Sequence, residues 1–141
     1  MKRQTPKTDW QIRYDENGRY AGDYFEAEDY QRIAGNIEYL RQMARELYTL
    51  VPLPALPQIT TASFAYAEDM NALEKGLEDL LQASFLPPGT PPFSVWQGNA
   101  PGPGPEDLNR LENICAVTRE NLAAQAQARQ RLAITLGGVQ F

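Results

Sequence analysis

Ala27-Glu-Asp-Tyr-Gln-Arg-Ile33 is the first of three similar segments in this chain, and together these segments decide the fold. The second is Ala67-Glu-Asp-Met-Asn-Ala-Leu73 and the third is Pro105-Glu-Asp-Leu-Asn-Arg-Leu111. Their starts lie 40 and 38 residues apart, from position 27 to 67 and from 67 to 105. Spacing of this length is typical of proteins that use one supersecondary unit repeatedly. We therefore expect three degenerate units of one architecture.

Each segment opens a stretch whose apolar residues recur in steps of three and four, the spacing of an amphipathic helix. The predicted helices run from about residue 27 to 49, 67 to 84 and 105 to 136. The Glu-Asp pair at each start favours the first helical turn by about 0.3–1 kcal/mol per acid. The predicted core stripes are Tyr30, Ile33, Ile37, Leu40, Ala44 and Leu47; Met70, Leu73, Leu77, Leu80 and Leu81; and Leu108, Leu111, Cys115, Thr118 and Leu122.

We expect one all-α domain, a three-helix bundle over residues 10–141 with units at about 10–50, 51–86 and 87–141. Residues 1–9 are predicted to form a flexible polar tail. Long Pro- and Gly-rich crossovers join the helices, and the first can span roughly 55 Å, more than the roughly 34 Å of the first helix. This reach favours helices that run in the same direction, but an antiparallel three-helix bundle stays open.

Two local features extend this picture. Asn17-Gly18 within residues 10–24 predicts a small N-terminal β-hairpin, because a type I′ turn requires positive φ at both central positions. In two of the three segments an arginine follows the glutamate by four residues, Glu28 to Arg32 and Glu106 to Arg110. This spacing predicts ion pairs within each helix.

The composition excludes several kinds of function. The 141 residues are 43% hydrophobic and 22% charged, with a net charge of −5, which fits a soluble globular protein but not a binder of nucleic acid or of an anionic membrane. There is no histidine and only one cysteine, Cys115, which we interpret as a buried inert thiol. We therefore predict no enzyme activity, no metal and no cofactor. No secretory signal or membrane span is expected.

An aromatic residue precedes the first two segments at the same offset, Tyr24 and Phe64, whereas the third segment has Gly102 there, with Phe93 or Trp96 as the substitute. Trp10 lies near the start of the chain. These side chains either cover a thin core or form an interface, where Tyr and Trp are enriched. The end of the third helix has few apolar residues before Leu132, Ile134 and Leu136, and it is expected to project and pair with another copy. The candidate interface residues are Trp10, Tyr24, Phe64, Trp96, Leu132 and Leu136.

The third segment, Glu106-Asp107 followed by Asn109-Arg110-Leu111-Glu112-Asn113, resembles repeated segments in tail-associated proteins of bacteriophages and prophages of Gram-positive bacteria. Gln31-Arg32-Ile33 and Asn71-Ala72-Leu73-Glu74 are weaker versions, and the resemblance covers about residues 20–125. It implies a non-enzymatic structural role with other tail or virion proteins as partners. Such a protein would occupy the bacterial cytoplasm during assembly and then the virion. The alternative is a module that binds a glycan or peptide through its aromatic surface.

Overall fold

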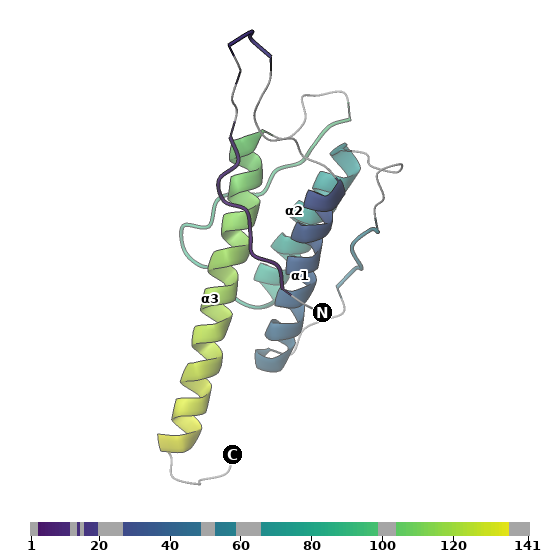
Figure 1. The fold of residues 1–141 in the computed structure, drawn as a ribbon. Coiled ribbons are helices and arrows are strands. Elements are labelled where there is room, and N and C mark those ends of the chain that lie inside the picture. The colour runs from purple at the N-terminus through teal and green to yellow at the C-terminus, as the bar shows by residue number, and fades with distance from the viewer. Residues whose placement is uncertain are drawn as a thin grey trace.

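Three helices packed against one another make up this all-α protein (Figure 1). They are α1 (Ala27–Leu47), α2 (Tyr66–Ala83) and α3 (Pro105–Thr135), so every predicted helix is confirmed with ends within two residues of the expected positions. The computed structural model describes residues 3–11, 14, 16–19, 27–48, 53–58, 66–98 and 104–135.

The three helices run in the same direction. Near their starts, Arg32 of α1 contacts Glu112 of α3, and near the other end Tyr48, just after α1, donates a hydrogen bond to Gln125 of α3. Arg110 near the start of α3 meets Glu74 in the middle of α2, and Leu81 near the end of α2 lines a pocket with Thr118 further along α3. Figure 1 shows all three helices beginning at one end of the bundle. The parallel arrangement favoured by the crossover length is thus the one that forms.

The first crossover returns along α1 and lies between α1 and α2. The Tyr30 hydroxyl donates a hydrogen bond to the Pro57 carbonyl at 3.0 Å, and Arg41 donates to the Pro54 carbonyl at 2.9 Å. Since Arg41 is the later residue of α1 but binds the earlier part of the crossover, residues 53–58 run antiparallel to the helix. Leu56 of this segment reaches the backbone of α2.

The second crossover fills the groove between α2 and α3 in the same manner. Asn71 holds the backbone of Trp96 and Glu74 accepts a hydrogen bond from the Ser94 backbone N–H, so residues 94–96 run antiparallel to α2. Arg110 of α3 donates to the Pro92 carbonyl from the other side of the groove.

Residues 3–11 occupy the third groove, between α3 and α1. The backbone N–H of Lys7 donates to Glu112 and that of Trp10 donates to Asn109, so this segment runs antiparallel to α3. The N–H of Gln4 donates to Asn36 of α1. We expected residues 1–9 to form a flexible tail, but the structure places residues 3–9 in this groove, because polar side chains of both helices bind their backbone.

The predicted stripes line one continuous core. The side chains of Tyr30, Ile33, Ile37 and the leucines of α2 are buried, as is Cys115 of α3, whereas Leu47 is partly buried. Trp10 joins this core from the N-terminal segment, with 5% of its surface exposed. The apolar spacing of the helices therefore predicted the core correctly, with Trp10 as an addition from outside the helices.

The predicted N-terminal hairpin is supported by a turn and by an isolated β-bridge at Tyr14. Residues 16–18 turn and Gly18 has φ of 77°, but Asn17 does not share this conformation, so the turn is not the expected type I′. The described residues contain no strand. The rest of the predicted hairpin, including residues 12, 13, 15 and 20–24, lies outside them.

We predict different consequences for alanine at the two glycines inside helices. A Cβ at position 35 would have no neighbouring atom within 4 Å, whereas at position 76 it would lie 2.7 Å from Leu56 Cδ2. Gly35→Ala should therefore raise the free energy of unfolding by about 1 kcal/mol, the helix-propensity difference. Gly76→Ala should gain clearly less than this, or lose stability, in denaturant titrations.

The Leu56→Ala background is the control for this pair. Removal of the leucine side chain frees the space beside position 76, so Gly76→Ala should there stabilise the chain as Gly35→Ala does. If both alanines are equally stabilising in the presence of Leu56, the close approach of the first crossover to α2 is wrong.

Candidate functional site

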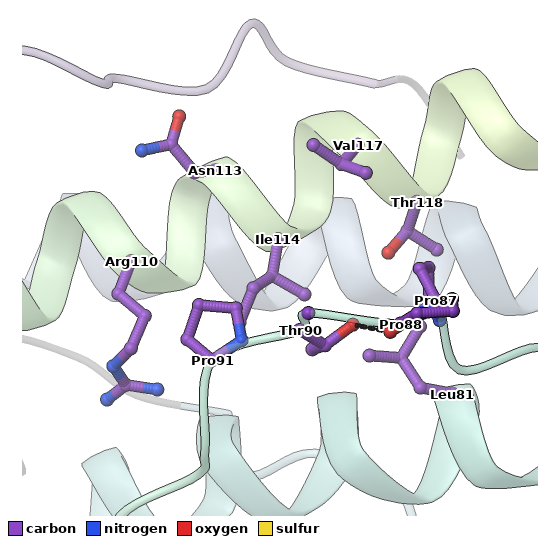
Figure 2. Close-up of a pocket in the computed structure, with 11 residues that line it drawn as sticks. Leu81, Pro87, Pro88, Thr90, Pro91, Arg110, Asn113, Ile114, Val117 and Thr118 are labelled. Carbon is purple, nitrogen blue, oxygen red and sulfur yellow. Dashed lines mark hydrogen bonds between the residues drawn. The ribbon is translucent and has the colours of Figure 1, made fainter.

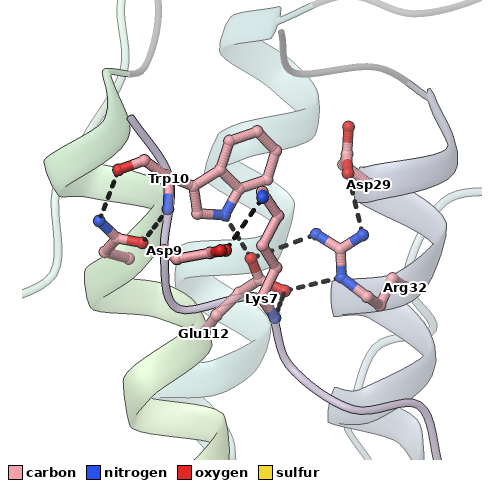
Figure 3. A network of polar contacts seen from close by, with 7 residues as sticks. Lys7, Asp9, Trp10, Asp29, Arg32 and Glu112 are labelled. Carbon is pink, nitrogen blue, oxygen red and sulfur yellow. Dashed lines mark hydrogen bonds and ion pairs between the residues drawn. The ribbon is translucent and has the colours of Figure 1, made fainter. Parts of the chain in front are cut away.

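The carboxylate of Glu112 in α3 binds three residues, two from the N-terminal segment and one from α1 (Figure 3). Its Oε1 accepts hydrogen bonds from the Lys7 backbone N–H at 2.9 Å and from Arg32 Nε at 2.7 Å. Its Oε2 accepts from the indole N–H of Trp10 and from Arg32 Nη2. A carboxylate offers about four lone-pair sites, so these donors satisfy Glu112 completely. The side chain is 1% exposed, and no acceptor capacity remains for a ligand.

Both the backbone and the ring of Trp10 are held by neighbouring side chains. Asn109 of α3 accepts a hydrogen bond from the Trp10 backbone N–H and donates one to its carbonyl. The Arg32 guanidinium lies 5.8 Å from the ring centre and the Lys7 ammonium 5.3 Å, both within the range of a cation–π contact. The indole is thus held by the N-terminal segment, α1 and α3 together.

The groove between α2 and α3 repeats this pattern. Glu74 of α2 is 2% exposed and binds Arg110 of α3 through both oxygens, with one further hydrogen bond from the Ser94 backbone. Asn71 accepts from the Trp96 N–H at 2.7 Å and donates to its carbonyl at 3.0 Å, as Asn109 does for Trp10. The same side-chain types thus bind a tryptophan-bearing segment in two grooves.

These contacts occupy equivalent positions in the three segments. Positions are counted here from the first glutamate of each segment. The arginine at the fourth position after this glutamate binds the glutamate at the sixth position of another segment: Arg32 binds Glu112, and Arg110 binds Glu74. The pairs connect α1 to α3 and α3 to α2, which leaves position 72 of α2 and position 34 of α1 as the third pair. Both of these are alanine. The arginine and its partner are therefore missing together.

The groove between α1 and α2 is held by other side chains. Arg41 is 2% exposed, and its Nη1 donates to Glu38 and to the Pro54 carbonyl of the crossover. Leu56 fills the space above Gly76. An apolar side chain and a different arginine therefore take the place of the Arg–Glu pair here.

Two shifted pKa values, those of Arg32 and Cys115, describe the ionisation of groups in this part of the structure. Burial alone would lower the pKa of Arg32, but hydrogen bonds and the charges of Glu112 and Asp29 raise it, so the guanidinium stays charged. Burial, with a smaller contribution from the charge of Glu112, raises the pKa of the Cys115 thiol to about 12. The thiolate is the nucleophilic form, so Cys115 is inert near neutral pH, as the sequence predicted.

The candidate interface residues differ in how far they are exposed. Trp10 is buried and Trp96 is partly buried against the core, and Leu132 is 59% exposed on α3. Tyr24, Phe64 and Leu136 lie outside the described residues. The structure thus brings none of the described three together, and their role in an interface stays a prediction.

The acidic partners predicted for Arg32 and Arg110 were wrong. Instead of Glu28, Arg32 binds Asp29 at 2.9 Å and Glu112, and Arg110 binds Glu74 rather than Glu106. The burial of an arginine and a glutamate on facing helices outcompetes a solvent-exposed pair within one helix. The signal in the sequence was the paired loss at Ala34 and Ala72, which is visible only when the three segments are aligned.

Comparison with known proteins gives no family for this arrangement. The chain matches no protein-family model, and no curated protein or solved structure is significantly similar to it. Among the described residues, no helix has the length and apolar character needed to cross a membrane.

We predict that Glu112→Gln and Glu74→Gln each lower the free energy of unfolding by about 3 kcal/mol, because each removes a buried carboxylate charge that is the main partner of a partly buried arginine. The matched control is Asp79→Asn, which removes a partner of the mostly exposed Lys75 and should change stability by less than about 0.5 kcal/mol. Urea denaturation followed by circular dichroism measures both. Equal effects at buried and exposed sites would contradict this account.

Completion of the third pair provides a second test. Ala34→Glu or Ala72→Arg alone introduces an unpaired charge, whereas the double variant introduces both partners. We expect a favourable coupling free energy of about 1 kcal/mol in a double-mutant cycle. Ala34→Glu combined with Ala126→Arg, on α3, should show no coupling. Additive effects for the 34/72 pair would show that the groove between α1 and α2 does not share the geometry of the other two grooves.

Proposed function

We propose that this protein is a non-enzymatic structural or assembly protein, associated with the tail of a phage or prophage and built from three degenerate repeats. The observation that carries this proposal is how the chain uses its two buried carboxylates. Glu112 and Glu74 each join one helical unit to another through a partly buried arginine, Arg32 or Arg110, and the chain itself supplies four donors to Glu112 and three to Glu74. Such groups hold a scaffold together and are not available to a substrate.

The family resemblance supports the same reading through particular residues. The resemblance rests on Asn109, Arg110 and Glu112, and these are the side chains that bind Trp10, Glu74 and Arg32. A motif that recurs because it closes grooves between helices belongs to the architecture. The structural role is therefore a better explanation of the motif than a catalytic one.

The surface for self-association in this proposal is the end of α3. Figure 1 shows α3 extending well past the ends of α1 and α2. Leu132 is 59% exposed and Ile134 79% exposed on this extension. We propose that it pairs with another copy of the chain or with a neighbouring tail or virion protein, in the bacterial cytoplasm during assembly and in the virion afterwards.

The alternative of an aromatic binding surface has less support. Trp10 is enclosed by Asn109, Glu112 and Arg32, and the backbone of Trp96 is held by Asn71. Trp10 is therefore too enclosed for a sugar to stack on its ring, and Trp96 is partly buried against the core.

Light scattering of the full chain after size exclusion tests the proposal. We expect an oligomer, or a stable complex with the product of a neighbouring tail gene, that Leu132→Lys with Ile134→Lys weakens by at least about tenfold, since lysine cannot enter an apolar contact without a large desolvation cost. Val95→Lys is the control, because Val95 is 80% exposed but lies on the second crossover. The proposal would be overturned by a protein that stays monomeric and does not bind the products of neighbouring tail genes.

A further inference from the structure

A cavity of about 230 Å³ lies between α2, α3 and the turn that follows α2 (Figure 2). Leu81 of α2, Ile114 and Val117 of α3 and the prolines of the turn form most of its wall. An apolar protein cavity of roughly 150 Å³ binds benzene. This cavity is about half again as large, so it has room for one substituted six-membered ring.

The outer wall of the cavity is rigid. Pro87-Pro88-Gly89-Thr90 form a type II turn, with Gly89 at φ of 82° and the Thr90 N–H donating to the Pro87 carbonyl at 3.2 Å. The Thr90 hydroxyl donates to the same carbonyl at 2.6 Å. Proline fixes φ at two of the four positions. The turn therefore keeps its shape and does not collapse into the space beneath it.

One polar group faces this space without a partner. Thr118 of α3 is 3% exposed, and its hydroxyl makes no hydrogen bond with the described part of the chain. Figure 2 shows this oxygen directed toward the turn. Arg110, at the other end of the cavity, is already neutralised by Glu74. The cavity is thus apolar and uncharged, with a single buried hydroxyl left to satisfy.

The chain itself fills the equivalent place in another groove. Ile114 stands eight residues after Glu106, and Gly76 stands eight residues after Glu68. At Gly76 the groove between α1 and α2 is filled by Leu56 from the first crossover. Between α2 and α3 the turn at residues 87–90 instead lines a cavity.

We propose that this cavity binds a single neutral, ring-sized group that is apolar apart from one hydroxyl or N–H, with a phenol ring as the type ligand. The ring would contact Leu81 and Ile114, and its polar atom would hydrogen-bond to Thr118. A charged ligand would lose its hydration without gaining a counter-charge. This inference is independent of the proposed structural role.

The same phenol chemistry has two sources, a free small molecule and the side chain of a tyrosine. Titration with p-cresol, which is the tyrosine side chain as a free molecule, tests the shared chemistry. N-acetyl-tyrosinamide, which adds the peptide groups on either side, tests whether the ring still enters when it is part of a chain. Binding of both assigns the site to a tyrosine-bearing partner, and binding of p-cresol alone assigns it to a small molecule.

The measurement is the shift of the Leu81 and Ile114 methyl signals in NMR spectra of the full-length protein. We expect saturable p-cresol binding in the millimolar range or tighter, with up to about a tenfold preference over toluene, the size of one net hydrogen bond. Thr118→Val keeps the volume and removes the hydroxyl, so this preference should disappear while toluene binding persists.

Val117→Phe should close the mouth of the cavity and weaken p-cresol by at least about tenfold, since an added ring overpacks the space that the ligand needs. Val95→Phe is the matched control, because Val95 is an exposed valine outside this cavity. Unshifted methyl signals at millimolar p-cresol, affinity unchanged by Val117→Phe, or equal affinity for p-cresol and toluene in the unaltered protein would each overturn the proposal.

Discussion

The interaction on which the rest of the structure depends is the buried carboxylate of Glu112. Its four donors come from the N-terminal segment and from α1, while the carboxylate itself belongs to α3. A buried charge is tolerated only when it is paired and hydrogen-bonded, so residues from both ends of the chain must be in place together for the core to close. This requirement couples the polar first residues of the chain to its last helix, which apolar packing alone would not do.

The parallel direction of the helices follows from the same design. Helices joined by short turns alternate in direction, whereas here each crossover returns along the helix it leaves and fills the groove to the next one. The extended segments carry backbone groups that need partners, and the asparagines and glutamates of the helices supply them. The two grooves that hold a tryptophan-bearing segment therefore use both an amide side chain and a carboxylate at fixed positions, which explains why Asn71 and Glu74 recur as Asn109 and Glu112.

Much of the fold could be predicted from the sequence because it depends on local rules. The helix limits followed from the Glu-Asp starts and the prolines, the buried stripe followed from apolar spacing, and the inert Cys115 followed from its place in that stripe. The groove contacts could not be predicted in the same way. Arg32 has acids at several spacings within reach, and only the three-dimensional arrangement selects Glu112. Residues 3–9 look like a solvated tail because the backbone, not an apolar side chain, makes most of their contacts with the helices.

Parallel helices also explain why each segment begins as it does. Three helix starts at one end of a bundle bring together three partial positive charges of about half an elementary charge each, which repel one another. A Glu-Asp pair in every first turn offsets this repulsion at the point where it arises. The residues that follow then supply a backbone clamp at Asn71 and Asn109, a core leucine, and a charged partner for the next helix. A single short segment thus carries the helix start, the core contact and the link between units, so its repetition specifies the arrangement of the bundle as well as its helices.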